Sequence, residues 1–209
     1  MDIAIVLYER FTALDAIGPY EVLSRLPGVS LAFLAAERGP ITTDNGMLTV
    51  VAERSLADVR GGDIILVPGG PGEVAARAGD TVLEWLRTAN ETSEWTTSVC
   101  TGSLVLAAAG LLEGRRATTH WLAFDELARL GAEPVHERVV FDGKLVTGAG
   151  VSAGIDMALS LAARVASPEV AQAIQLSIEY DPEPPFDAGS PAKAPQAVVE
   201  TLRARSRFT

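Results

Sequence analysis

Residues 95–112 have the sequence WTTSVCTGSLVLAAAGLL, in which a short strand-like run meets a segment rich in small helix-forming side chains. The first part, 95–99, is typical of a buried strand, and 101–112 is typical of a helix that ends near Gly110. Cys100 stands at the junction between them. The stretch therefore predicts an α/β fold in which a strand, a sharp turn and a helix present one cysteine.

The residues around Cys100 are small, as a sharp turn requires. Ser98 and Gly102 flank the cysteine in the pattern of a nucleophile elbow, where larger side chains would collide. Ser98 departs from the glycine that hydrolases carry at that position. A thiol on such a turn lies at a helix N-terminus, where backbone N–H groups and the helix dipole favour the thiolate. The pattern predicts that Cys100 is an ionised nucleophile.

Local sequence leaves alternatives open for both residues of the turn. Most unpaired cysteines are buried packing residues, so Cys100 is also compatible with a structural role. Thr101 either contacts substrate or simply starts the helix. The position of Cys100 at a strand–helix junction favours the catalytic hypothesis.

A second strand end carries a glycine-rich turn. Residues 63–67 (DIILV) are followed by the sequence PGGPG at 68–72. Ligands of parallel sheets bind beyond the carboxyl ends of the strands, so this turn and Cys100 are expected at the same edge. The amides of Gly69 and Gly70 would then complete an anion cradle facing the thiol. An ordinary tight turn is the alternative.

Strand-like and helix-like segments alternate along the chain, which predicts a mostly parallel sheet sandwiched by helices in a single domain over 1–209. Residues 181–195 contain five prolines and are expected to wrap the surface before a terminal helix. The expected strands are 2–8, 30–36, 63–67 and 95–99, with hairpins over 41–51 (around Asp44-Asn45-Gly46) and 133–147 (across Asp142-Gly143). The expected helices are 15–26 with Pro19 near its first turn, 80–90, 101–112, 121–130, 151–166, 168–180 and 196–205.

The composition limits partners and location. With 17 Lys+Arg against 27 Asp+Glu, the formal charge is −10, and such a field disfavours nucleic acid and anionic membrane surfaces. One cysteine excludes an internal disulfide, and no Cys/His cluster has zinc spacing, so no metal is expected. The N-terminal run lacks a basic region and is interrupted by Glu9 and Arg10, which argues against a signal peptide or membrane span. A cytoplasmic location is the resulting expectation.

Several stretches resemble the ThiJ/PfpI superfamily, whose fold is flavodoxin-like and similar to that of class I glutamine amidotransferases. The similarity covers about residues 2–205. It is most specific in the cysteine segment and in the PPFDAGSP tail, which resemble a branch that converts isonitriles to N-substituted formamides. The stretches are VPGGPG at 67–72, SVCTGSLVLAAAGLL at 98–112, RRATTHW at 115–121, LDAIGPYEVL at 14–23, VHERVVFDGKLVTGAG at 135–150, SAGIDMAL at 152–159 and LSIEYDPEPPFDAGSP at 176–191.

The resemblance implies a role for each matching residue. Cys100 is the catalytic cysteine, Thr101 is the threonine that follows it, and Asp15 is the acid of the first strand-to-helix loop. The turn Gly69-Gly70 matches the oxyanion-binding turn. Members are generally homodimers and use no cofactor, so an isonitrile and a second copy of the chain are the expected partners.

Asp15 and His120 also need an interpretation from the residues themselves. The neighbours of Asp15 are apolar, so partial desolvation would raise its pKa toward neutrality; capping the first helix is the alternative. His120 follows Cys100 by a helix and a turn and either returns to the site or is a structural residue beside Trp121. The chain lacks the C-terminal His-x-Glu of amidotransferases, and Thr101 stands where protease-like relatives have histidine.

Two other functions remain open on the same sequence. A glyoxalase, deglycase or stress-linked chaperone would use the same thiol with a nearby acid. A non-enzymatic ligand sensor is the third hypothesis, because similar TTHW segments occur in regulators fused to helix-turn-helix modules. We expect no such module here, because the chain ends after one short helix. The basic residues at 203, 205 and 207 are expected to form a solvated helix end.

Overall fold

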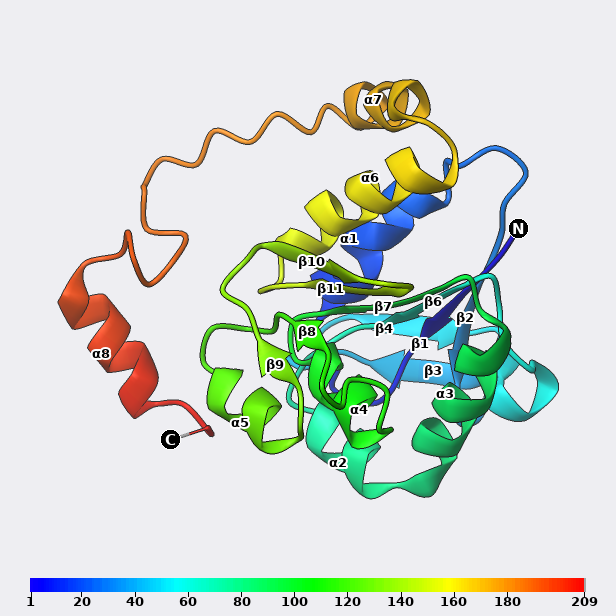
Figure 1. Cartoon of the computed structure of the whole chain (residues 1–209), viewed down its shortest axis with the longest axis horizontal. Helices are drawn as coiled ribbons and strands as arrows, with labels where there is room; N and C mark the ends of the chain where they lie inside the picture. Colours follow the sequence, from blue (N-terminus) through cyan, green and yellow to red (C-terminus); the bar gives the residue numbers. More distant parts are fainter. Residues whose placement is uncertain (209) are drawn as a thin grey trace.

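The computed structural model describes residues 1–208, and within them a seven-stranded sheet forms the centre of the molecule (Figure 1). Among these strands only the edge strand β10 runs antiparallel to its neighbour. The mostly parallel sheet predicted from the sequence is therefore confirmed. The order is β10 (Val139–Asp142), β11 (Leu145–Gly148), β7 (Trp95–Val99), β6 (Ile64–Val67), β1 (Asp2–Val6), β2 (Ser30–Ala35) and β5 (Arg54–Ser55).

Helices cover both faces of the sheet, as Figure 1 shows. The central strands β1 and β6 are apolar and buried almost throughout because both of their faces lie under helices. One face carries α1 (Ala13–Leu23), α6 (Ala153–Val165) and α7 (Pro168–Ser177); the other carries α2 (Glu73–Ala78), α3 (Asp80–Thr92) and α4 (Gly102–Ala108). The helix α5 (Phe124–Arg129) lies beside α4, next to the short paired strands β8 (Arg116–Ala117) and β9 (Glu133–Pro134).

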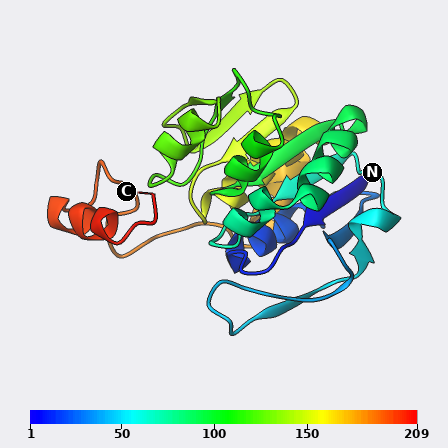
Figure 2. The same ribbon diagram turned by 90° about the horizontal axis from the view of Figure 1, so that it is seen from below.

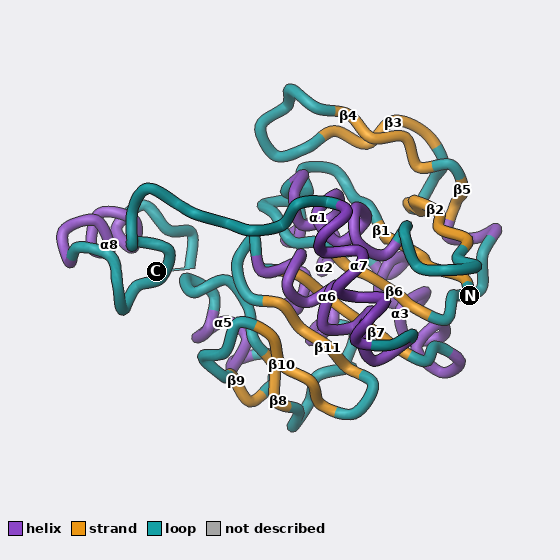
Figure 3. The backbone as a smooth tube through the Cα atoms, turned by 90° about the horizontal axis from the view of Figure 1, so that it is seen from above, coloured by secondary structure: helices purple, strands orange, loops and turns teal. Residues whose placement is uncertain are grey.

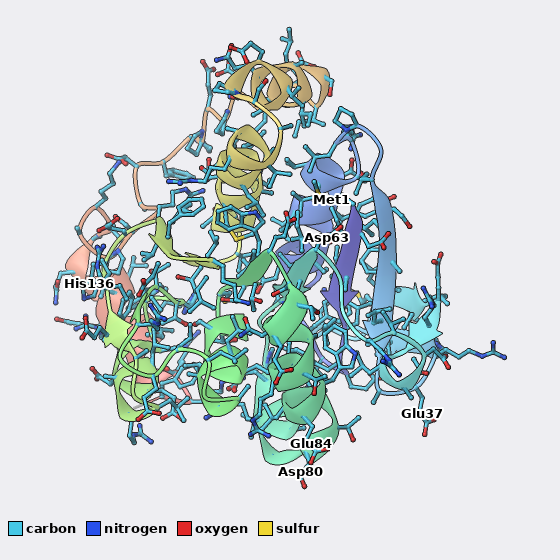
Figure 4. The ribbon with its side chains drawn as sticks, turned by 45° about the vertical axis from the view of Figure 1, so that its right-hand side comes forward. Met1, Glu37, Asp63, Asp80, Glu84 and His136 are labelled. Atoms are coloured by element: carbon cyan, nitrogen blue, oxygen red, sulfur yellow. The ribbon has the colours of Figure 1, made fainter. Side chains whose placement is uncertain are left out.

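The strand register brings three chain segments together at the carboxyl ends of the strands. Val67 of β6 is paired with Ser98 of β7, and Gly148 of β11 is paired with Val99. The residues that follow these strands therefore meet. At the amino ends of the strands, Met1 and Asp63 lie together, with 4.0 Å between the terminal nitrogen and the carboxylate (Figure 4).

Several predicted elements differ in extent from the observed ones. The first helix begins at Ala13, so Pro19 lies in its interior and packs closely against Gly154 of α6. The predicted hairpin over 133–147 forms only as β10 and β11, because 133–134 pairs in parallel with β8. Neither α2 nor the 3₁₀ turn Leu56–Asp58 was predicted. Both are too short to show a periodic pattern of apolar residues in the sequence.

The first predicted hairpin is confirmed as β3 (Gly39–Thr42) paired with β4 (Thr49–Ala52). Its loop has Gly46 at φ +74°, a conformation that favours glycine. The hairpin forms a sheet of its own beside β2 of the central sheet (Figure 3).

The C-terminal segment leaves the body of the molecule after α7. Residues 181–189 are all exposed and form the arc in Figures 1 and 2, so they do not wrap the surface as predicted. The segment is rich in acidic residues and proline and has little apolar surface to bury. The helix α8 (Gln196–Ala204) contacts the body of the molecule again through Val199, which is buried.

Across residues 1–208, no helix combines the length and hydropathy needed to cross a bilayer.

Candidate active site

Cys100 occupies a strained turn between β7 and α4. Its φ is +58°, a left-handed conformation that costs a residue with a side chain on the order of 1–3 kcal/mol. The turn is held from both sides: the Cys100 N–H donates to the carbonyls of Gly148 (3.0 Å) and Ala149 (2.7 Å). The Cys100 carbonyl accepts hydrogen bonds from the hydroxyls of Ser103 and Thr119, each at 3.1 Å. The predicted nucleophile elbow is therefore the local geometry of this cysteine.

Close backbone approaches explain the small residues of the elbow. A Cβ on Gly102 would lie 2.1 Å from the Val67 carbonyl oxygen, so no side chain fits there. Ser98 does fit in the place of the hydrolase glycine. It is fully buried, and its hydroxyl has no hydrogen-bond partner among residues 1–208.

Asp15, from the first turn of α1, lies against the thiol. Its side chain is fully buried, and its Oδ2 accepts the Gly69 N–H at 2.9 Å. Its Oδ1 has no partner within the described residues. The N-cap of α1 is Thr12 and no side chain caps it, so capping does not account for Asp15.

Burial raises the pKa of Asp15 from 3.8 to about 7. The Gly69 N–H and, after it, the neighbouring Cys100 thiol favour the carboxylate and limit the rise, whereas the charge of Asp44 adds to it. A carboxyl group with this pKa can both donate and accept a proton near neutral pH.

The expectation of an ionised thiol requires correction. Burial, and after it the charge of Asp15, raises the pKa of Cys100 well above its usual value. The backbone and hydroxyl of Thr101 lower the pKa of the thiol, but the effect of desolvation is larger. The resting site therefore holds a thiol beside a carboxyl group, and a thiolate forms only when the proton passes to Asp15.

The amides of the glycine turn already have acceptors inside the protein. Gly69 N donates to Asp15, and Gly70 N donates to the Thr101 hydroxyl oxygen at 3.0 Å. The turn therefore orients the acid and the threonine. Binding an oxyanion, the role expected from the sequence, would require one of these amides to exchange its partner.

We predict that Gly69→Ala disrupts the site, because a Cβ there would lie 2.5 Å from the Thr101 nitrogen and 2.8 Å from Asp15 Oδ2. Displacing these groups is expected to lower the rate of a reaction catalysed by Cys100 by about 10²-fold. It should also reduce the unfolding free energy by about 1–3 kcal/mol. Steady-state kinetics and urea unfolding measure the two effects. The matched control is Gly79→Ala, whose Cβ would meet only the Ala75 carbonyl at 3.6 Å. Equal activity in the two variants would contradict the prediction.

A cavity of about 760 Å³ adjoins the elbow. Its wall combines apolar and aromatic side chains with residues of the C-terminal segment, among them Leu14, Thr119, Trp121, Phe124, Val151 and Pro191. Neither Cys100 nor Asp15 lines it, but residues next to them or bonded to them do. Leu14 precedes Asp15, Thr119 donates to the Cys100 carbonyl, and Ala149 accepts the Cys100 N–H.

His120 lies on the cavity wall and shows no hydrogen bond to the thiol within the described residues. Its Nδ1 accepts the Leu122 N–H at 3.3 Å, and its ring centroid is 6.0 Å from that of Trp121. Burial, and after it the charge of Arg207, lowers its pKa, so the imidazole is neutral near pH 7. His136 also lines the cavity and stacks on Phe124; Figure 4 shows it on the side of the molecule that carries α8.

Sequence reasoning missed several polar residues around the glycine turn. The Tyr8 hydroxyl donates to the Pro68 carbonyl, and burial raises the pKa of Tyr8 well above its usual value. Glu73, at the start of α2, is fully buried and paired with Arg77 and Arg207. The position of Tyr8 at the end of a strand could have indicated its role, but no local sequence pattern links Glu73 with Arg207.

Within residues 1–208, no group of three or more His, Cys, Asp or Glu side chains is placed to hold a metal ion.

A cysteine on a strained elbow beside a buried carboxyl group, at the carboxyl edge of a mostly parallel sheet, defines a class of α/β proteins. Comparison with known proteins identifies the family. Residues 1–164 match the family model of the DJ-1/PfpI family, and the chain belongs to that family.

The similarity extends over nearly the whole chain in some relatives. The sequence is 45% identical over 206 residues to isonitrile hydratase from Pseudomonas putida, covering 99% of this chain and 90% of that protein. A ThiJ/PfpI family protein from Pseudomonas syringae has a crystal structure that matches with a TM-score of 0.95 and 38% identity, over 98% of this chain and 85% of that one.

More distant relatives carry other names. The HTH-type transcriptional regulator CdhR from Pseudomonas aeruginosa is 35% identical over 149 residues, which are 70% of this chain and 43% of the regulator. The DJ-1/PfpI relatives also include proteins named as deglycases.

Proposed function

We propose that this protein is an enzyme that adds water to an isonitrile and releases an N-substituted formamide. The observation that carries the proposal is the buried Asp15 carboxyl group, with its raised pKa, beside the Cys100 thiol and near a cavity lined in part by apolar and aromatic side chains. The 45% identity to an isonitrile hydratase over almost the full chain supports it. The reaction needs a proton donor and a nucleophile at the same carbon, and this pair supplies both.

The first step forms a covalent intermediate. Transfer of the thiol proton to Asp15 creates a thiolate and a carboxylic acid side by side. The acid protonates the terminal carbon of R–N≡C while the sulfur bonds to that carbon, which gives the thioimidate R–N=CH–S–Cys100 and leaves Asp15 as a carboxylate. The raised pKa of Asp15 suits this step, because a carboxyl group of ordinary acidity would not hold the proton near pH 7.

The second step releases the product. The Asp15 carboxylate accepts a proton from water as the water oxygen bonds to the thioimidate carbon, and that proton passes to the nitrogen. The C–S bond of the resulting R–NH–CH(OH)–S–Cys100 then breaks. The hydroxyl proton returns to the Asp15–Cys100 pair, and R–NH–CHO leaves. Thr101 stabilises the departing thiolate, since its backbone and hydroxyl lower the pKa of the thiol.

The wall of the cavity suits the N-substituent of the isonitrile. Aromatic and aliphatic side chains such as Trp121, Phe124 and Val151 can bury an apolar substituent and do not react with the isonitrile carbon.

We also propose that the protein is a homodimer. Large apolar side chains remain exposed on the single chain, including Val51 (59%), Val74 (52%) and Leu176 (81%).

Incubation with cyclohexyl isocyanide tests the proposed activity. We expect N-cyclohexylformamide to accumulate in proportion to enzyme concentration, followed by chromatography. A parallel incubation with methylglyoxal tests the glyoxalase and deglycase alternative, which uses the same thiol and acid. Consumption of methylglyoxal without formation of the formamide would replace the proposal by this alternative, and absence of both reactions would favour the sensor hypothesis.

A further inference from the structure

The end of the chain returns to the glycine turn. Beyond α8, the Arg207 guanidinium donates to the Gly70 carbonyl at 3.3 Å and to Glu73 Oε1 at 3.1 Å. The segment that follows α8 lies near α5 in Figure 1. The sequence suggested a solvated basic end, whereas 34% of the Arg207 side chain is exposed and its head group is ion-paired.

The partner of Arg207 is a buried carboxylate that needs positive charge. Glu73 is fully buried, and its other carboxylate oxygen accepts from Arg77, which also pairs with Glu126 at 2.7 Å. Burying an ionised carboxylate is costly unless it is paired and hydrogen-bonded. Arg207 thus completes the neutralisation of Glu73 from a distant part of the chain.

Apolar contacts hold Arg207 in this position. Val199 of α8 is 4% exposed, and Phe208 packs against the hydrophobic core. The Arg207 guanidinium lies 4.7 Å from the centroid of the Phe208 ring. The docked end therefore presents its arginine in a defined place.

Gly70 connects this contact to the thiol. Its carbonyl accepts hydrogen bonds from both Arg207 and the Glu73 N–H, the latter at 3.1 Å. Its own N–H donates to the Thr101 hydroxyl at 3.0 Å, and that hydroxyl donates back to the Gly70 carbonyl at 3.5 Å, so Gly70 holds the side chain that follows Cys100. Gly70 has φ +127°, a conformation that favours glycine, and the backbone of Arg10 and Thr12 packs closely against it.

We propose that Arg207 is a positioning residue for the hydration reaction, acting through the Gly70 carbonyl to hold Thr101, the residue next to the Cys100 thiol, in place. This inference rests on the proposed function for its kinetic consequence. Its structural part concerns the thiol alone and can be tested separately.

The test compares Arg207→Ala with Arg205→Ala, a matched variant that removes an arginine from the same segment. For Arg207→Ala we expect kcat with cyclohexyl isocyanide to fall roughly tenfold while KM changes less than about twofold, because the substrate cavity remains intact. The pH profile of Cys100 alkylation by iodoacetamide should shift upward by about half a unit, because Thr101, whose polar groups lower the pKa of the thiol, is held less firmly. Arg205→Ala should match the unmodified protein in both measurements.

The two measurements separate this inference from the proposed function. Identical alkylation profiles in the Arg207 and Arg205 variants would overturn the positioning role, whatever the activity. If the unmodified protein forms no formamide, the proposed function fails, while a shifted alkylation profile in Arg207→Ala alone would still support the link between chain end and thiol. Far-ultraviolet circular dichroism of both variants verifies that each remains folded.

Discussion

Replacing Cys100 by alanine is expected to abolish isonitrile hydration, lowering kcat by at least about 10⁴-fold, because no other group can form the thioimidate. The fold should persist. The elbow is held by backbone hydrogen bonds from Cys100 N to Gly148 and Ala149 and by the hydroxyls on the Cys100 carbonyl, none of which involves the sulfur. Formamide production and thermal unfolding of the purified variant measure the two effects.

Ser98→Ala is the matched control for this variant. It removes a buried hydroxyl that has no hydrogen-bond partner among the described residues, two positions before the cysteine. We expect unchanged activity and equal or greater stability, because an unsatisfied polar group is lost from the interior. Substantial formamide production by Cys100→Ala would exclude covalent catalysis by this thiol.

Asp15→Asn is expected to reduce kcat by about 10²–10⁴-fold, the usual contribution of a general acid and base. The amide oxygen of asparagine can still accept the Gly69 N–H, so the geometry of the turn should survive. An amide cannot shuttle the proton that the thiol, the isonitrile carbon and the attacking water each require. Single-turnover kinetics would show whether formation of the thioimidate is the step that is lost.

Asp15→Asn is expected to increase the stability of the fold although it lowers the activity. The pKa of Asp15 rises from 3.8 to about 7 on folding. Between these pH values the folded chain holds a proton that the unfolded chain has lost, so the unfolding free energy falls as the pH rises from about 4 to about 7. An asparagine side chain does not titrate and has no such dependence. Relative to the unmodified protein, Asp15→Asn should gain stability across that window, by up to about 4 kcal/mol above pH 7.

Urea unfolding of both proteins at pH 5 and pH 8 measures this gain. The difference in unfolding free energy between Asp15→Asn and the unmodified chain should be larger at pH 8. A difference that is independent of pH would show that Asp15 has an ordinary carboxyl pKa in the folded protein, and the proton transfers assigned to it would then lose their basis.

Local patterns were sufficient to predict the elbow. The strand 95–99, the small residues at 98 and 102 and the helix that follows are contiguous, so short-range sterics specify them, and the structure shows the expected turn. The hairpin around Gly46 was predictable for the same reason. By contrast, Pro19 lies inside α1 because tertiary packing of α1 on α6 outweighs the local preference of proline for a first turn.

The charge state of the thiol was predicted in the wrong direction. The sequence showed a helix N-terminus after Cys100 and suggested a lowered pKa. The thiol is only 5% exposed, and α4 is a short helix of 7 residues. Desolvation and the neighbouring Asp15 therefore outweigh the donors at the helix start.

The parallel α/β architecture, the strained turn at Cys100 and the glycine turn after residue 67 could all be read from the chain, because each depends on residues that are adjacent in it. Which groups meet at that edge of the sheet is settled by long-range packing instead. Asp15 reaches the thiol from another helix, the Gly69 and Gly70 amides turn inward to Asp15 and Thr101, and Arg207 crosses 137 positions of the chain to reach Gly70. Contacts of this kind depend on how helices and chain ends pack on the sheet, and that packing is a property of the whole fold.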